Sequence, residues 1–145
     1  MTPATGARRR AREVAFRVAY QADVAGDAYS FAWKLRQEDE DPLSNDQREL
    51  VDDLVTLLEA RVVEVDGMLR DSMEERWPLH RLAATDRAVL RIAVAELLAR
   101  PGSPARVVLD EAIEIARRFG SQESGRFVNG VLDRAVRRLR PGEFA

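Results

Sequence analysis

The sequence predicts an all-α fold of six or seven helices. Apolar residues recur at spacings of three and four over most of the 145 residues, which is the period of an amphipathic helix. Glycine, proline or a capping residue separates each periodic segment from the next. No run of alternating β-branched and polar residues competes with this pattern, so we expect no sheet.

Two helices are expected in the first forty residues. The first covers about 7–24 along a stripe of small apolar residues and ends at Gly26. The stripe consists of Ala11, Val14, Ala15, Val18 and Ala22. A shorter amphipathic helix covers about 28–37, and the acidic run before Pro42 reads as a loop.

A long central helix is expected over about 45–72. Ser44 followed by Gln47 matches a capping box, in which the two side chains satisfy free backbone N–H groups at a helix start. A helix of this length spans on the order of 40 Å, enough to support several shorter helices. Trp77-Pro78 interrupts the helical pattern.

Three more helices complete the prediction. One begins at Thr85-Asp86 and stops at Pro101, the next covers about 105–119 with Gly120 as its C-terminal cap, and the last covers about 122–139 behind a Ser121 cap. Asn129-Gly130 is typical of a hairpin turn, but the apolar spacing continues across it, so we keep the helix. Gly130 there costs about 1 kcal/mol relative to alanine, which close packing of a backbone or ligand would offset.

Charge is distributed unevenly along the chain. The formal net charge is −2, yet residues 1–20 carry +4 and residues 117–145 carry +4, while residues 37–75 carry −11. Localised positive surfaces of this kind suit a polyanion such as a nucleic-acid backbone. The chain has no cysteine, no apolar run of membrane-spanning length and no signal-peptide pattern, which fits a cytoplasmic protein.

Aromatic residues accompany the arginines in both basic ends. On a helix of 100° per residue, Arg9, Phe16 and Tyr20 fall opposite the small-residue stripe. In the last helix Phe127 falls between Arg134 and Arg138. Exposed aromatics that stack on bases, beside arginines that bind phosphates, commonly hold single-stranded RNA. The alternative, that these aromatics belong to the core, stays open at this point.

Signatures of catalysis are missing, so we do not expect an enzyme. His80 is the only histidine, and no nucleophile elbow, P-loop or zinc-ligand spacing occurs. The densest carboxylate set outside the acidic middle is Asp110, Glu111 and Glu114. It reads as a solvated face in which Glu114 pairs with Arg118, rather than as a metal site, and no cofactor is expected.

Three segments together resemble the NusB family of bacterial transcription antitermination factors. They are Arg8-Arg9-Arg10-Ala11-Arg12-Glu13 through Tyr20-Gln21, Asp86-Arg87-Ala88-Val89-Leu90-Arg91-Ile92-Ala93 through Glu96-Leu97, and Val108-Leu109-Asp110-Glu111-Ala112 through Phe127-Val128-Asn129-Gly130-Val131-Leu132-Asp133. The resemblance covers essentially the whole chain, and its last segment is the most specific. Residues 24–60 match poorly, so no contact is transferred to them.

The resemblance implies two small helical subdomains packed side by side, here about 1–75 and 76–145, within one RNA-binding domain. It implies binding of a boxA-type RNA together with NusE, a ribosomal protein of the small subunit, in an RNA polymerase antitermination complex that promotes read-through, notably in ribosomal RNA operons. By position, the RNA-binding residues are Arg8, Arg9, Arg10, Arg12, Tyr20, Glu123, Ser124 and Phe127. Asp86 falls on the side of the ribosomal-protein partner.

Alternative functions remain at this point. The chain is a protein-binding helical adaptor if its basic ends are only solvated, and a metal-dependent hydrolase if Asp110, Glu111 and Glu114 hold a cation. A homodimer that covers the RNA face is also open. RNA cytosine methyltransferases that carry a similar domain need about 200 further residues for their cofactor domain, which argues against that reading.

Overall fold

The computed structural model describes residues 3–39, 42–74 and 78–144, and these form six α-helices and one short 3₁₀ helix. The helices are α1 (Pro3–Ala25), α2 (Tyr29–Asp39), α3 (Asn45–Asp71), η1 (Leu79–Arg81), α4 (Ala84–Ala99), α5 (Ala105–Phe119) and α6 (Gln122–Leu139). No strand occurs in these ranges, so the all-α prediction is confirmed.

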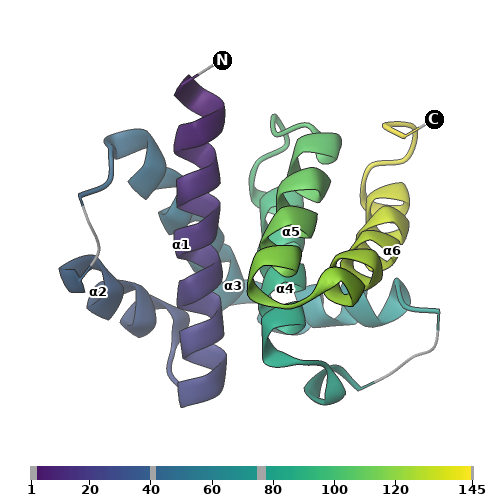
Figure 1. The fold of residues 1–145 in the computed structure, drawn as a ribbon, viewed down its shortest axis with the longest axis horizontal. Coiled ribbons are helices and arrows are strands. Elements are labelled where there is room, and N and C mark those ends of the chain that lie inside the picture. The colour runs from purple at the N-terminus through teal and green to yellow at the C-terminus, as the bar shows by residue number, and fades with distance from the viewer. Residues whose placement is uncertain (1–2, 40–41, 75–77, 145) are drawn as a thin grey trace.

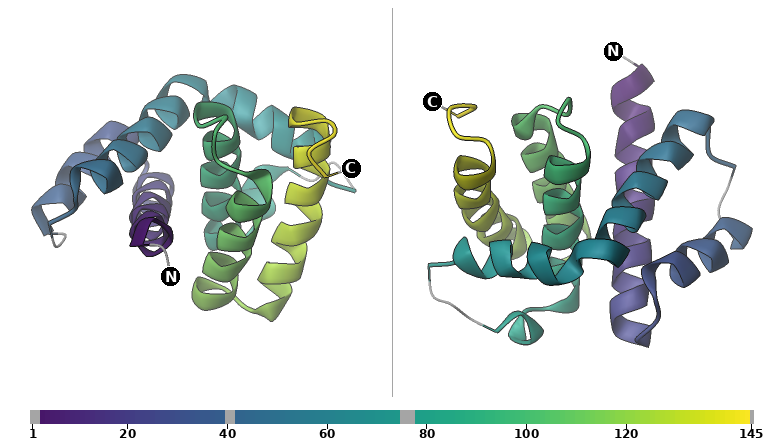
Figure 2. Two further views of the ribbon diagram at one scale, coloured as in Figure 1. Left: turned by 90° about the horizontal axis from the view of Figure 1, so that it is seen from above. Right: turned by 180° about the vertical axis from the view of Figure 1, so that it is seen from behind.

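The helices are arranged around two long elements, α1 and α3. α3 crosses behind the others, from α2 at one end to α6 at the other (Figures 1 and 2). α1 and α4 lie side by side in front of it, and α5 and α6 pack together on the far side of α4. The start of α1 and the end of α6 lie at the same edge of the molecule (Figure 1). α1 packs on both α3 and α4, so the helices of the two halves share one core. The division into subdomains about 1–75 and 76–145 stays a prediction.

The capping residues identified in the sequence act as expected. Ser44 accepts a hydrogen bond from the backbone N–H of Gln47, and the Gln47 side chain accepts one from the Ser44 N–H. Ser121 caps α6 through the N–H of Ser124, and Gly120 ends α5. α3 departs from helical geometry at Arg61, where two helical stretches meet at a bend.

The core consists of apolar faces contributed by every α-helix. The five stripe residues of α1 predicted from the sequence are all buried. α4 is buried over most of its surface, because Ala88–Val89–Leu90 and the following turns are covered by α1, α3, α5 and α6. A helix covered on all sides needs apolar residues on all sides, and α4 has them.

The residues beyond α6 complete the ends of two other helices. Arg140 donates hydrogen bonds to the carbonyls of Leu97, Arg100 and Ser103, at the end of α4 and in the loop after it. The Glu143 carboxylate accepts a hydrogen bond from the N–H of Ala105, the first residue of α5. Pro104, which precedes α5, provides no side-chain cap. Glu143, although far away in the sequence, therefore caps the start of α5.

The observed helices differ from the predicted ones mainly at their ends. α1 begins at Pro3 instead of about residue 7, and α2 extends to Asp39. η1 was not predicted. α6 runs unbroken through Asn129-Gly130. Among the described residues outside the helix backbone, only the guanidinium of Arg134 comes within 4 Å of the place for a Cβ on Gly130. Residues 40, 41 and Trp77, which belong to the predicted breaks, lie outside the described residues. No described helix is long and apolar enough to cross a membrane.

Candidate functional site

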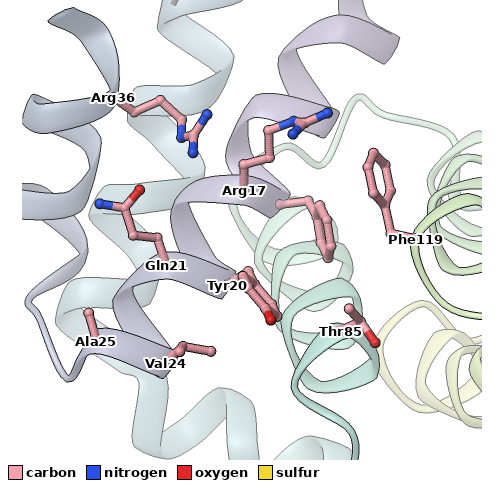
Figure 3. A pocket seen from close by; sticks show the side chains of 9 residues that line it. Arg17, Tyr20, Gln21, Val24, Ala25, Arg36, Thr85 and Phe119 are labelled. Carbon is pink, nitrogen blue, oxygen red and sulfur yellow. The ribbon is translucent and has the colours of Figure 1, made fainter. Parts of the chain in front are cut away.

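The outer face of α1 carries an open pocket of about 530 Å³ (Figure 3). Four helices line it: α1 contributes most of the lining residues, and α2, α4 and α5 contribute one each. Its lining residues are Phe16, Arg17, Tyr20, Gln21, Val24, Ala25, Arg36, Thr85 and Phe119. Tyr20 and Arg17 project from α1 toward the rim, and Phe119 faces them from the end of α5 (Figure 3).

Aromatic rings form a connected group in this pocket. The centroid of the Phe16 ring lies 5.0 Å from that of Phe119 and 6.2 Å from that of Tyr20. The guanidinium of Arg17 lies over the Phe119 ring at 5.0 Å, and that of Arg118 lies at 5.2 Å. Phe16 is 3% exposed and belongs to the core, whereas Tyr20 is 38% exposed and offers part of its ring to solvent. The two aromatics predicted to share a face therefore divide between core and surface.

The arginine cluster at the start of α1 is divided in the same way. Arg8 is exposed, and Arg10 lines a second hollow of about 300 Å³ beside Glu13, Arg17 and Arg36. Arg9 is half exposed and forms an ion pair with Glu111 of α5, which raises the pKa of Arg9 above its ordinary value through hydrogen bonding and charge attraction. Arg10 therefore adjoins the pocket, because Arg17 and Arg36 line both hollows, whereas Arg8 and Arg9 line neither of the two.

Arg12 does not lie on this surface, so the prediction that its side chain contacts RNA is wrong. The side chain is 4% exposed. Its Nε and Nη2 each donate a hydrogen bond of 2.7 Å to the Glu96 carboxylate on α4, and the Ser103 hydroxyl donates to the same carboxylate at 2.8 Å. Arg12 follows the small-residue stripe into the interior, because position 12 adjoins Ala11 and Ala15 on the buried side of α1. Its guanidinium is part of the core.

Asp86 and Ser124 meet where the start of α4 lies against the start of α6. Burial raises the pKa of Asp86 above its ordinary value, and a hydrogen bond with Ser124 partly opposes that rise. Within the described part of the chain, Oδ1 of Asp86 is buried without a hydrogen-bond partner. Asp86 also follows Thr85, which lines the pocket. The predicted partner-binding residue thus adjoins a predicted RNA-binding residue and the Tyr20 pocket.

The remaining predicted residues lie on α6. Phe127 is 36% exposed, and Glu123 is exposed in the first turn. The predicted arginine edge around Phe127 is incomplete, because Arg134 is engaged elsewhere. Its Nε donates to the carbonyl of Ser72 at 2.5 Å, and its Nη1 lies 3.8 Å from Glu74.

The carboxylates of α5 do not form one solvated face. Glu111 is buried and holds Arg9, while Asp110 lies 4.0 Å from Arg106. Arg118 pairs with Glu13 of α1 at 2.6 Å, so the predicted pairing of Glu114 with Arg118 is wrong. In the described ranges no group of three or more candidate ligands could hold a metal ion.

Sequence reasoning missed several residues of this site. Arg17 belongs to the basic N-terminal segment, and its spacing of three from Tyr20 places both residues on one helix face. The sequence therefore contained the signal needed to predict it. Phe119, the last residue of α5, was not predicted to belong to the site. Thr85 and Arg36 reach the pocket only through tertiary packing, and no local pattern signals them.

Comparison with known proteins gives a consistent match over nearly the whole chain. A family model described as the NusB family matches residues 9–137. The transcription antitermination protein NusB of Koribacter versatilis is 39% identical, with 96% of this chain and 94% of that protein covered. The protein of the same name from Anaeromyxobacter dehalogenans is 41% identical, with coverages of 94% and 95%.

Solved structures agree. NusB of T. maritima superposes with a TM-score of 0.83 at 32% identity, covering 94% of this chain and 96% of that one. A chain from a complex of the antitermination factors NusB and NusE with double-stranded RNA gives a TM-score of 0.82 at 26% identity, with coverages of 91% and 97%. A chain from the crystal structure of a plectonemic RNA supercoil gives 0.86 at 26%, with coverages of 94% and 98%.

Proposed function

Because the chain belongs to the NusB family, we propose that it is a transcription antitermination factor that binds RNA together with NusE. In this role it acts as a binding protein and not as an enzyme. It promotes read-through by RNA polymerase, notably in ribosomal RNA operons, and works in the cytoplasm. The RNA is of the boxA type.

One observation carries the proposal. The hollow that Arg10 lines adjoins the Tyr20 pocket, since Arg17 and Arg36 line both, and Thr85 extends that pocket to the start of α4. Arg10 and Arg17 share one hollow, and Arg17 and Tyr20 share the next. Arginines beside the partly exposed Tyr20 ring suit the alternation of phosphate and base along an RNA strand.

The geometry supports distinct roles for the residues of this surface. Arg8, Arg9 and Arg10 neutralise phosphates, and Tyr20 contacts bases. Ser124, Glu123 and Phe127 of α6 contribute the second RNA-facing edge. Asp86 lies beside Ser124, so NusE docking there would place that protein next to the RNA.

RNA binding at two salt concentrations tests the proposal. We expect Arg10→Ala to weaken binding and to reduce the slope of log K against log salt by about 0.7 to 0.9, the contribution of one phosphate contact. Tyr20→Ala should lower the preference for boxA over unrelated RNA. Arg61→Ala is the control, because the Arg61 side chain on α3 is exposed and lines neither of the two hollows.

Single-stranded and double-stranded RNA, each with and without NusE, complete the design. Equal affinity for every RNA, unchanged by the α1 substitutions, would contradict RNA recognition by this face. NusE binding without any RNA affinity would favour the adaptor reading, for which exposed Val24 and Phe31 beside the α1 surface are the supporting observation.

A further inference from the structure

Arg9 and Glu111 form a side-on ion pair between α1 and α5. Nε of Arg9 donates to both carboxylate oxygens of Glu111, at 3.0 and 3.3 Å, and Nη2 donates to Oε1 at 3.0 Å. The two partners differ strongly in accessibility, since the Glu111 side chain is 8% exposed and that of Arg9 is 51% exposed. The buried carboxylate therefore holds an arginine whose other side faces solvent.

The pairing leaves one edge of the guanidinium open. A guanidinium has five N–H donors in a fixed plane. The side-on contact occupies the Nε donor and one donor of Nη2, so the second Nη2 donor and both Nη1 donors remain. No described residue accepts a hydrogen bond from Nη1 of Arg9. The Nη1–Nη2 edge matches two oxygens of a phosphate in a bidentate contact.

We propose that Glu111 is a positioning residue, which holds Arg9 so that its Nη1–Nη2 edge is presented to an RNA phosphate. This inference rests on the proposed RNA binding and adds a residue that does not itself touch RNA. Arg8 is exposed with no ion pair among the described residues, so its side chain must be ordered when RNA binds. Glu111 has already restricted Arg9, which lowers that cost.

The negative charge of Glu111 also repels RNA, which opposes its positioning effect on Arg9. A control variant separates the charge effect from the positioning effect. Any carboxylate close to Arg9 repels phosphate, so removing it raises affinity for RNA. Glu114 supplies the matched case. It lies one helical turn after Glu111 on α5, is exposed, and acts on Arg9 by charge with no hydrogen bond. Substitution of Glu114 therefore removes charge alone, whereas substitution of Glu111 removes charge and positioning.

Affinity for boxA RNA, measured by fluorescence anisotropy at two salt concentrations, tests the proposal. Relative to Glu114→Ala, we expect Glu111→Ala to bind roughly twofold to tenfold more weakly, the range for ordering one long side chain. In an Arg9→Ala or Arg9→Lys background, Glu111→Ala and Glu114→Ala should have equal effects, because neither background has a guanidinium fork to position. Glu111→Gln provides the same comparison against Glu114→Gln if the alanine variant fails to fold by circular dichroism.

The outcomes separate this inference from the function on which it rests. If the unaltered protein does not bind RNA, or if Arg9→Ala binds like it, the proposed role of Arg9 fails and the inference fails with it. If Arg9→Ala weakens binding but the Glu111 variants bind as tightly as the Glu114 variants, the positioning role alone is overturned. A loss from Glu111→Ala that persists undiminished in the Arg9→Ala background would show a structural effect and would overturn it as well.

Discussion

Arg12 and Glu96 form a two-pronged ion pair in the interior, with both hydrogen bonds at 2.7 Å and both side chains less than 5% exposed. It joins α1 to α4, and Ser103 donates a third hydrogen bond to the same carboxylate. A buried ion pair contributes little net stability compared with an apolar replacement, but loss of one partner leaves an uncompensated charge. Removal of either partner therefore weakens the packing of α1 on α4.

We expect Arg12→Ala to lower the free energy of unfolding by about 3–5 kcal/mol, because Glu96 would stay buried without its cation. Urea denaturation measures this change. Arg61→Ala is the matched control, since it breaks only an exposed ion pair with Glu64 and should change the free energy of unfolding far less. A loss for Arg12→Ala no larger than that of the control would contradict the structural role.

Phe16 and Tyr20 should separate stability from binding. Phe16→Ala removes a buried ring that contacts Phe119, so we expect a loss of about 3–5 kcal/mol in unfolding free energy. Tyr20→Ala removes a ring that is more than a third exposed, so its stability loss should be clearly smaller while RNA binding falls. Chemical denaturation and RNA titration of both variants test the distinction, and equal stability losses would show that Tyr20 is core.

Asp86→Asn should change how stability depends on pH. Burial raises the folded-state pKa of Asp86 above its ordinary value of 3.8, so the folded protein favours the protonated form. The stability that protonated Asp86 contributes to the folded state is complete below the unfolded-state pKa and is lost as pH rises through the folded-state pKa. We therefore expect the asparagine variant to gain stability relative to the unaltered protein as pH rises above about 4.

Thermal melting of both proteins between pH 4 and pH 7 measures that difference. Glu123→Gln is the control, because it removes an exposed carboxylate close by on α6. A constant difference across the range, or one that favours the aspartate at pH 7, would contradict a buried carboxylate with an unsatisfied oxygen.

Gly130→Ala should stabilise the protein by about 0.5–1 kcal/mol, because alanine restricts the unfolded chain and fits the helix. In the described part of the chain, the nearest atoms to the added methyl group outside the helix backbone are those of the Arg134 guanidinium, at 3.7 and 3.8 Å. Gly26→Ala should instead destabilise, since Gly26 has φ +75° at the end of α1. Denaturation midpoints of the two variants should shift in opposite directions, and a loss for Gly130→Ala would point to packing that the helix does not show.

The helices were predictable because their signals are local. Ser44 with Gln47, Ser121 and Gly120 act on backbone groups within four residues, so spacing alone identifies them. The early start of α1 at Pro3 was missed because residues 3–6 carry no apolar stripe. The helix through Gly130 was predicted correctly from the apolar residues around it, and among the described residues no other backbone packs closely on Gly130.

The candidate site was only partly predictable because its pairings are distant in sequence. Helical phasing placed Arg9 and Tyr20 on an outer face, but the partner of Arg9 lies 102 residues away. Helical phasing could not show which of Phe16 and Tyr20 is buried, because α4 and α5 cover one side of that helix face and leave the other side open. Arg12 was wrongly predicted to lie on the surface, because its position among neighbouring arginines does not reveal that α4 places the Glu96 carboxylate opposite it.

The hydrogen bonds made by Arg140 and Glu143 make the segment after α6 an integral part of the fold, because it fastens the end of α4 and the start of α5. Proteolytic trimming after Leu139 would leave three carbonyls around the end of α4 and one N–H at the start of α5 without these partners. A fusion partner joined directly behind Leu139 would do the same. Any tag at this end therefore belongs beyond the last residue, separated by a flexible spacer.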